Sequence, residues 1–161
     1  MRTTLLAAAF AQLGLSPFAA VAAEETAAGA EEAGKMNVGE QLPPKVRGLL
    51  IEEMQGILGA SQEIQAAIVQ GDHETVAQQA QAIHDSFIMK QEMTQEDEQA
   101  LLAAVPDAFL KQDKALHQLS EALAEAGRSQ NTALQRRQFN EMIKGCVRCH
   151  RDYASARFPK L

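Results

Sequence analysis

Hydrophobic side chains recur every three or four residues along most of this chain, the spacing that places them on one face of an α-helix. The first such stretch opens at Pro43-Pro44, since proline is tolerated in a first helical turn, and it ends near Gly71. At about 100° per residue its inward positions share one narrow stripe. They are Val46, Leu50, Ile57, Ser61, Ile64 and Ile68. We therefore predict a long first helix.

A second and a third long helix follow the same pattern. Asp72 is suited to cap a helix that runs to about Lys90. The third helix is predicted from Asp107 to Ala126, and Gly127 closes it. The inward positions are Val76, Ala80, Ile83 and Phe87 in the second helix, and Phe109, Leu116, Leu119 and Leu123 in the third. Because the turn at Gly71 is short, the first two helices should pack antiparallel.

A brief helix and a last long helix complete the pattern. Thr94 and Asp97 match a capping box for a short helix that Pro106 interrupts. The last long helix starts near residues 129 to 132. Four long helices with short connections and one apolar stripe each favour an antiparallel bundle. We predict an all-α fold in which residues 43 to 161 form a four-helix-bundle domain.

The composition agrees with a helical protein of one domain. The chain has 161 residues, enough for one ordinary domain. It has no tryptophan and one tyrosine, whereas alanine, glutamine, glutamate and leucine dominate. These residues are typical of helices rather than of a pleated sheet.

The first residues are predicted to lie outside this domain. A positive start at Met1-Arg2, a mostly apolar run over residues 5 to 22 and small residues after it are typical of a secretory signal peptide, here residues 1 to 23. Gln12 and Pro17 interrupt the run, which argues against a membrane anchor. Residues 24 to 42 are small, acidic and aperiodic, and we predict a flexible mature N-terminus there. We expect a periplasmic protein without stable membrane insertion once the signal is removed.

Charge is distributed unevenly along the chain. Residues 24 to 135 carry seven Lys or Arg against nineteen Asp or Glu, whereas residues 136 to 161 carry seven against two. The basic end either complements the dipole of the last helix or forms a docking patch for an acidic partner. The overall acidity argues against a nucleic-acid partner.

The only two cysteines lie in "GCVRCHRDY", residues 145 to 153. Cys146 and Cys149 are one helical turn apart and His150 follows directly, so all three side chains project from one surface of a helix. A heme requires two thiols for its two vinyl groups and an imidazole for its iron, and the C-x-x-C-H spacing supplies that set.

Other uses of two cysteines fit this chain less well. A structural zinc site needs four ligands, and no second cysteine pair exists. A thioredoxin-like motif begins a helix after a strand, whereas this pair lies near the end of the last helix. A disulfide across one helical turn closes almost no loop and stabilises little. We therefore predict one covalently attached heme c near the end of the last helix.

The segment "RRQFNEMIKGCVRCHRDYASARF" resembles the C-terminal motif of the class II c-type cytochromes, four-helix bundles that include cytochrome c′ and the low-spin cytochrome c556 type. The resemblance rests on one heme motif almost at the C-terminus, an aromatic residue seven positions before Cys146 and a tyrosine three after His150. It covers about residues 43 to 158, where the other helices match in pattern and length. It implies that Cys146 and Cys149 form thioethers with the heme and that His150 is the proximal iron ligand, the roles that the spacing also gives.

In that family the residue on the distal side of the heme comes from the first helix, four positions after an arginine. It is often methionine in low-spin members and apolar in gas-binding ones. Counting from Arg47 places Ile51 there, which leaves the iron open. The helical count instead puts Ile51 about 140° from Val46 and Met54 about 80° from it, on the inward shoulder. One turn of register therefore makes Met54 the ligand, and we favour Met54.

Three further histidines are not predicted to bind the heme iron. Antiparallel packing about Gly71 brings His84 near the distal side, but a hydrogen-bonded histidine is the better interpretation. His73 and His117 are assigned no role. The sequence shows no distal acid–base pair that argues for catalysis.

These observations predict a periplasmic carrier of single electrons rather than an enzyme, with redox proteins as partners. Lys144, Arg148 and Arg151 are candidates for orienting an acidic partner at the heme edge. One alternative is a five-coordinate heme protein that binds nitric oxide or carbon monoxide under Ile51. Another is a heme-free thiol-disulfide oxidoreductase. A homodimer through the first two helices is common in the resembling family.

Overall fold

The computed structural model describes residues 36 to 86 and 88 to 161, which belong to one compact unit. The predicted signal peptide, the predicted flexible segment as far as residue 35 and the predicted core residue Phe87 lie outside this part of the chain. Within the described residues, seven helices form: α1 Val38–Gln41, α2 Pro44–Gln70, α3 His73–Asp85, α4 Met89–Glu92, α5 Gln95–Ala104, α6 Asp107–Arg128 and α7 Thr132–Tyr153. None of these helices is both long enough and apolar enough to cross a membrane.

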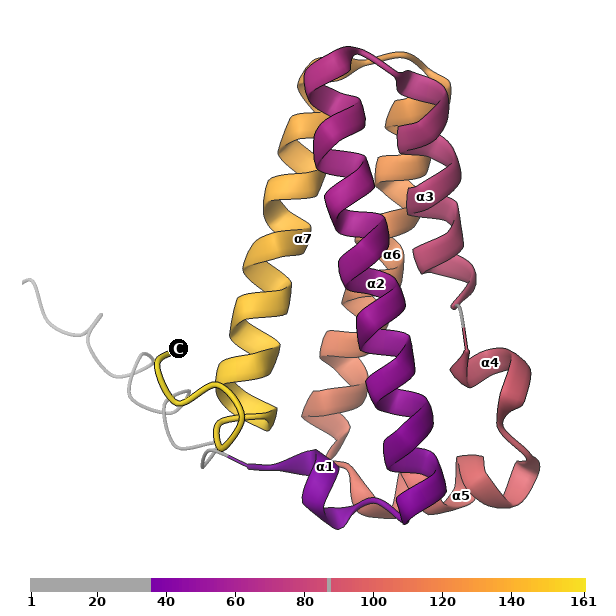
Figure 1. Ribbon diagram of the computed structural model, residues 1–161, viewed down its shortest axis with the longest axis vertical. Coiled ribbons are helices and arrows are strands. Elements are labelled where there is room, and N and C mark those ends of the chain that lie inside the picture. Colours follow the sequence, from indigo (N-terminus) through magenta and orange to yellow (C-terminus); the bar gives the residue numbers. More distant parts are fainter. Residues whose placement is uncertain (1–35, 87) are drawn as a thin grey trace, which may run out of the picture. The chain divides into compact units, whose positions relative to one another are not determined.

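Four of these helices, α2, α3, α6 and α7, form an antiparallel bundle (Figure 1). Two short turns at one end, which we term the closed end, join α2 to α3 and α6 to α7. The connection from α3 to α6 is longer and carries α4 and α5 along the side and across the opposite end, the open end. The all-α antiparallel four-helix bundle predicted from the sequence is confirmed.

The helix caps predicted at Gly71, Asp72 and Thr94 are present. Gly71 ends α2 with a φ of 74°, a left-handed conformation that glycine adopts without strain. Asp72 then caps α3 by accepting a hydrogen bond from the Thr75 N–H at 3.1 Å. Asn131 caps α7 in the same way, and Thr94 and Asp97 form the predicted capping box of α5. Local side chains therefore set the starts of α3, α5 and α7.

The core of the closed end is made of the predicted inward stripes. Ile64, Val76, Ala80, Ile83 and Leu123 are each fully buried there. Packing is tightest at Gly127, where an added Cβ would lie 2.7 Å from the Ala77 nitrogen. The sequence predicted that Gly127 closes the third helix, but α6 continues to Arg128, and this glycine instead permits close approach of α3.

The second long helix is shorter than predicted. It ends at Asp85 rather than near Lys90, and Ser86 follows with a φ of 67°. The cause lies on α2, where the buried Glu53 carboxylate accepts hydrogen bonds from the Ile88 and Met89 N–H groups at 2.6 and 3.1 Å. These bonds satisfy two N–H groups at the start of a separate helix, α4, and draw the chain away from the axis of α3.

The packed part of the chain begins before the predicted boundary at residue 43. Within the segment predicted to be flexible, residues 38 to 41 form α1, and Val38 and Leu42 are buried. The Met36 N–H donates to the Asp152 carbonyl at 2.8 Å, and the Asn37 side chain accepts from the Ala156 N–H at 2.7 Å. This segment, residues 36 to 42, therefore acts as a clasp that holds the end of α7, and we call it the N-terminal clasp.

Candidate functional site

Helix α7 places the two cysteines and the histidine of the C-x-x-C-H motif along one cavity at the open end. The cavity has a volume of about 440 Å³, within the range of roughly 300 to 1,000 Å³ that is usual for cofactor pockets, and we call it the heme cavity. Its walls are residues of α2, α6 and α7, with the N-terminal clasp and the segment after α7 at one end. Cys146, Cys149 and His150 are half-buried, and both thiols are free.

His150 is held by an aromatic neighbour from beyond the helix end. Its ring stacks on the Phe158 ring with centroids 4.5 Å apart and an angle of 14° between the planes. Burial lowers the pKa of His150, and the positive charge of Arg157 acts in the same direction. The neutral imidazole is the form that binds iron. The surroundings of His150 therefore favour the protonation state that a proximal ligand needs.

The cysteines lie in surroundings that keep them as thiols. Burial raises the pKa of Cys149 to about 11, and the negative charges of Cys146 and Asp113 add to this shift. Burial also raises the pKa of Cys146. Thiol-disulfide oxidoreductases use cysteines whose pKa is lowered by cations or a helix N-terminus. This site therefore lacks the feature that activates a cysteine for disulfide exchange.

The end wall of the heme cavity is an apolar cluster between the N-terminal clasp and α7. Tyr153 is buried there and meets the Phe109 ring edge-on with centroids 5.3 Å apart. Val38, Leu42 and Val46 pack in the same cluster, and Cys149 lies against it. This apolar packing covers one side of Cys149.

The α2 wall of the heme cavity contains both predicted distal residues. Met54 is half-buried and packs against the bundle core, whereas Ile51 is 44% exposed. At about 100° per residue, the wall residues span an arc from about 20° at Ile57 to about 140° at Ile51, measured from Val46, and Met54 lies near its centre. The α2 residues of this wall are Arg47, Leu50, Ile51, Met54, Ile57, Leu58 and Ser61.

One buried polar atom in the heme cavity has no partner. Among the described residues, Gln112 Oε1 is the only buried side-chain nitrogen or oxygen atom without a hydrogen bond. Gln112 extends from α6 into the wall of this cavity. Buried polar atoms are normally paired, so an orphan here is the feature expected of a cavity shaped for a bound group. The thiol pair, the imidazole and the cavity size fit a covalently attached heme.

The three other histidines lie outside the heme cavity. His84 lines a second cavity of about 490 Å³, which also contacts α4 and α5 and which we call the side cavity. Its Nδ1 lies 3.0 Å from the His117 carbonyl oxygen, as the hydrogen-bonded interpretation of His84 predicted. His73 pairs with the buried Gln135 at the closed end. The sequence interpretation missed the paired role of His117 and the buried Glu53, although the Asp113-to-His117 spacing of four residues was a usable signal.

The comparison with known families agrees with this geometry. A family model described as Cytochrome C' matches residues 45 to 154. Neither a curated protein nor a solved structure matches the chain. The matched span holds α2 to α7 almost entirely and includes all three motif side chains. Because it covers more than half of the chain, the protein belongs to the cytochrome c′ family, whose members carry covalently bound heme c.

Proposed function

We propose that the protein is a periplasmic carrier of single electrons with one heme c, in which Met54 is the sixth iron ligand. The observation that carries the proposal is the place of Met54 at the centre of the α2 wall of the heme cavity, where its thioether is half-buried. A saturated iron changes little in structure when its oxidation state changes, which suits electron transfer.

Each wall of the cavity has a separate task in this function. Cys146 and Cys149 bind the heme through thioethers, and His150, held by the Phe158 ring, is the proximal ligand. The heme supplies a reversible one-electron couple when bound. The apolar end wall around Tyr153 shields one end of the cavity from water.

The partner side of the function rests on the basic face of α7. Arg148 is exposed and lies at the wall of the heme cavity. Lys144 and Arg151 each pair with an acidic neighbour, Glu141 and Asp152, at 2.8 Å. We propose that Arg148 contributes most to orienting an acidic redox partner, because the charge of the other two is partly compensated within the helix. The test is the salt dependence of the electron-transfer rate in Arg148→Glu.

Carbon monoxide distinguishes a saturated iron from an open one. The protein is exported in a host with heme maturation machinery, and absorption spectra are recorded oxidised, reduced, and reduced with carbon monoxide. We expect low-spin spectra that carbon monoxide does not change. Met54→Leu should convert the spectrum to one that carbon monoxide shifts, whereas the control Met93→Leu, on the side cavity, should not. A low-spin Met54→Leu protein indifferent to carbon monoxide would exclude Met54 as the ligand.

The second candidate function is gas binding at a five-coordinate iron. It is favoured by Ile51, which lines the same α2 wall as Met54 and is an apolar residue. In that case the wild-type protein has a high-spin spectrum that carbon monoxide shifts, and Ile51→Phe lowers the affinity for carbon monoxide by blocking the distal side. The same spectra therefore decide between the two functions.

A further inference from the structure

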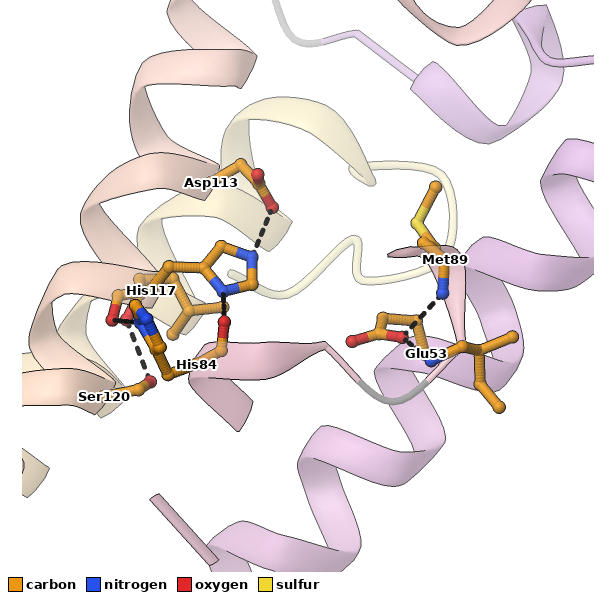
Figure 2. Close-up of polar contacts among 8 residues, drawn as sticks. Glu53, His84, Met89, Asp113, His117 and Ser120 are labelled. Atoms are coloured by element: carbon orange, nitrogen blue, oxygen red, sulfur yellow. Dashed lines mark hydrogen bonds and ion pairs between the residues drawn. The ribbon is translucent and has the colours of Figure 1, made fainter. Parts of the chain in front are cut away.

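The side cavity contains a polar cluster that neither electron carriage nor gas binding explains. Figure 2 shows His117 of α6 between His84 of α3 and Asp113, one turn earlier on α6. The His84 Nδ1 lies 3.0 Å from the His117 carbonyl oxygen, and the His117 Nδ1 lies 2.9 Å from the His84 carbonyl oxygen. The two histidines thus bind each other's backbone in a reciprocal pair.

This pairing fixes the proton on one nitrogen of each ring. A carbonyl oxygen only accepts hydrogen bonds, so each Nδ1 must carry a hydrogen. The neutral form of His117 therefore has a lone pair, not a hydrogen, on Nε2. That nitrogen lies 3.8 Å from Asp113 Oδ1. A lone pair facing a carboxylate is unfavourable, so the contact is stabilised only when the two groups hold one proton between them.

Asp113 connects this proton to the heme cavity. Its side chain lines both the side cavity and the heme cavity, as Met54 does. The Asp113 side chain is 51% exposed; partial burial still raises its pKa, while His117 acts in the opposite direction and the Glu53 carboxylate adds to the rise. The negative charge of Asp113 in turn contributes to the raised pKa of Cys149. The carboxyl group is therefore electrostatically coupled to the wall that holds the heme.

Charged and titratable groups from the neighbouring helices line the two cavities that Asp113 also lines. In the side cavity these are Glu53 of α2, His84 of α3, Lys90 of α4 and Glu98 of α5. In the heme cavity the α7 wall contributes Arg148, Cys149 and His150. Lys90 and Glu98 are exposed, as Asp113 is, so solvent screens the effect of their charges on it.

We propose that Asp113 and His117 form a proton-binding site whose affinity for one proton is linked to the oxidation state of the heme. The proposal rests on the heme being bound in the cavity that Asp113 lines, and it extends the electron-carrier function without depending on which residue is the sixth ligand.

The linkage has a defined direction and stoichiometry. When a one-electron acceptor oxidises the ferrous iron, one electron leaves for the acceptor and the heme gains one positive charge. That charge lowers the proton affinity of the neighbouring pair, and one proton passes to solvent. Reduction by a one-electron donor reverses both transfers. The reduction potential is therefore higher at low pH and falls as the pair loses its proton.

The test compares potential and proton binding in the heme-loaded protein. The midpoint potential is measured from about pH 4 to about pH 9, which brackets the ordinary pKa values of Asp and His. Wild-type potential should fall through this range, and Asp113→Asn should flatten the curve. The Cε1–H resonance of His117, assigned with His117→Asn, should titrate at different pH values in the reduced and oxidised protein, and this difference should disappear in Asp113→Asn.

Controls separate the pair from general charge effects. Glu98→Gln removes a carboxylate from the wall of the same cavity without contacting His117, and it should leave the pH dependence as in the wild type. His117→Asn keeps a donor near the Nδ1 position and should flatten the curve like Asp113→Asn. A pH dependence that survives in both variants would overturn the linkage while leaving electron carriage intact, whereas the lack of any reversible couple would overturn the proposed function itself.

Discussion

The two ends of the bundle differ in how they treat a buried glutamine. At the closed end, Gln135 is fully buried, and its amide nitrogen donates to the Ala126 carbonyl and pairs with His73 Nδ1 at 3.0 and 2.8 Å. At the open end, Gln112 Oε1 is buried without a partner at the wall of the heme cavity. At the closed end, protein groups satisfy the glutamine side chain, whereas at the open end the glutamine oxygen has no protein partner among the described residues.

The largest expected effect is the loss of covalent heme attachment at the open end. In Cys146→Ser with Cys149→Ser, no thioether can form, so denatured protein should carry no heme, as measured by heme staining of a denaturing gel. The single variants should retain one thioether and some stain. Heme that stays with the denatured double variant would contradict the assignment. A wild-type protein that never carries heme after maturation would instead favour thiol chemistry.

The next effect tests the closed end as the source of stability. Ile64→Ala should lower the free energy of unfolding by about 2 to 5 kcal/mol, because a fully buried side chain leaves a cavity. Val69→Ala, five residues later on the same helix, is the control, since Val69 is 82% exposed. It should change stability by less than about 0.5 kcal/mol. Urea unfolding of both variants measures the contrast, and equal losses would refute it.

Substitution of Gly127 tests how closely α3 and α6 pack at the closed end. Gly127→Ala should destabilise by about 1 to 3 kcal/mol, because its new Cβ meets the Ala77 backbone. Gly48→Ala has no neighbour within 4 Å of its new Cβ and should stabilise by up to about 1 kcal/mol through helix propensity. Thermal unfolding gives both signs, and a shift in the same direction for the two variants would rule out close α3–α6 packing as the reason for Gly127.

The same substitution at the two glutamines compares the two ends of the bundle directly. Gln135→Leu should lower the free energy of unfolding by about 1 to 3 kcal/mol, because the buried hydrogen bonds of Gln135 to the Ala126 carbonyl and to His73 Nδ1 are both lost. Gln112→Leu loses only the 3.4 Å bond from its amide nitrogen to Asp152 and should have a clearly smaller effect. Urea titrations of the two variants make the measurement. If Gln112→Leu is the more damaging change, the orphan oxygen is not a consequence of the cavity.

The smallest expected effect concerns α5 at the open end. Hydrogen bonding from Lys45 lowers the pKa of Asp97 to about 2, and hydrogen bonds from Thr94 act in the same direction. A depressed folded pKa contributes stability that is present above the ordinary value near 4 and is lost as the pH falls through about 2. Asp97→Asn should therefore flatten the decline of stability between these pH values. A decline as steep as in the wild type would show that other carboxylates cause it.

The sequence predicted the features that depend on neighbours along the helix. The inward stripes, the caps at Asp72 and Thr94, and the common face of Cys146, Cys149 and His150 follow from spacing alone. Features set by a partner far along the chain were missed. Glu53 determines where α3 ends. From the sequence alone an acidic residue is expected to be exposed, and only the structure shows the hydrogen bonds from the N–H groups of residues 88 and 89 that accompany its burial.

The same limit applied to the candidate site. The C-x-x-C-H motif could be recognised in the sequence because its two cysteines and its histidine lie within five residues of one another. The proton pair was not, because the tautomer of His117 is fixed by the carbonyl of His84, 33 residues away on another helix. The family pattern, counted from Arg47, predicts Ile51 as the distal residue. The position of Met54 at the centre of the cavity wall depends on how the whole of α2 is oriented in the bundle.

The N-terminal clasp has a consequence for the order in which the protein forms. It joins Asn37 to residues 155 and 156, contacts that span 118 and 119 positions of the chain. Closing so large a loop carries a high entropic cost and is deferred until the rest of the bundle can offset it. We therefore expect the N-terminal clasp, which closes one end of the heme cavity, to form after the rest of the bundle.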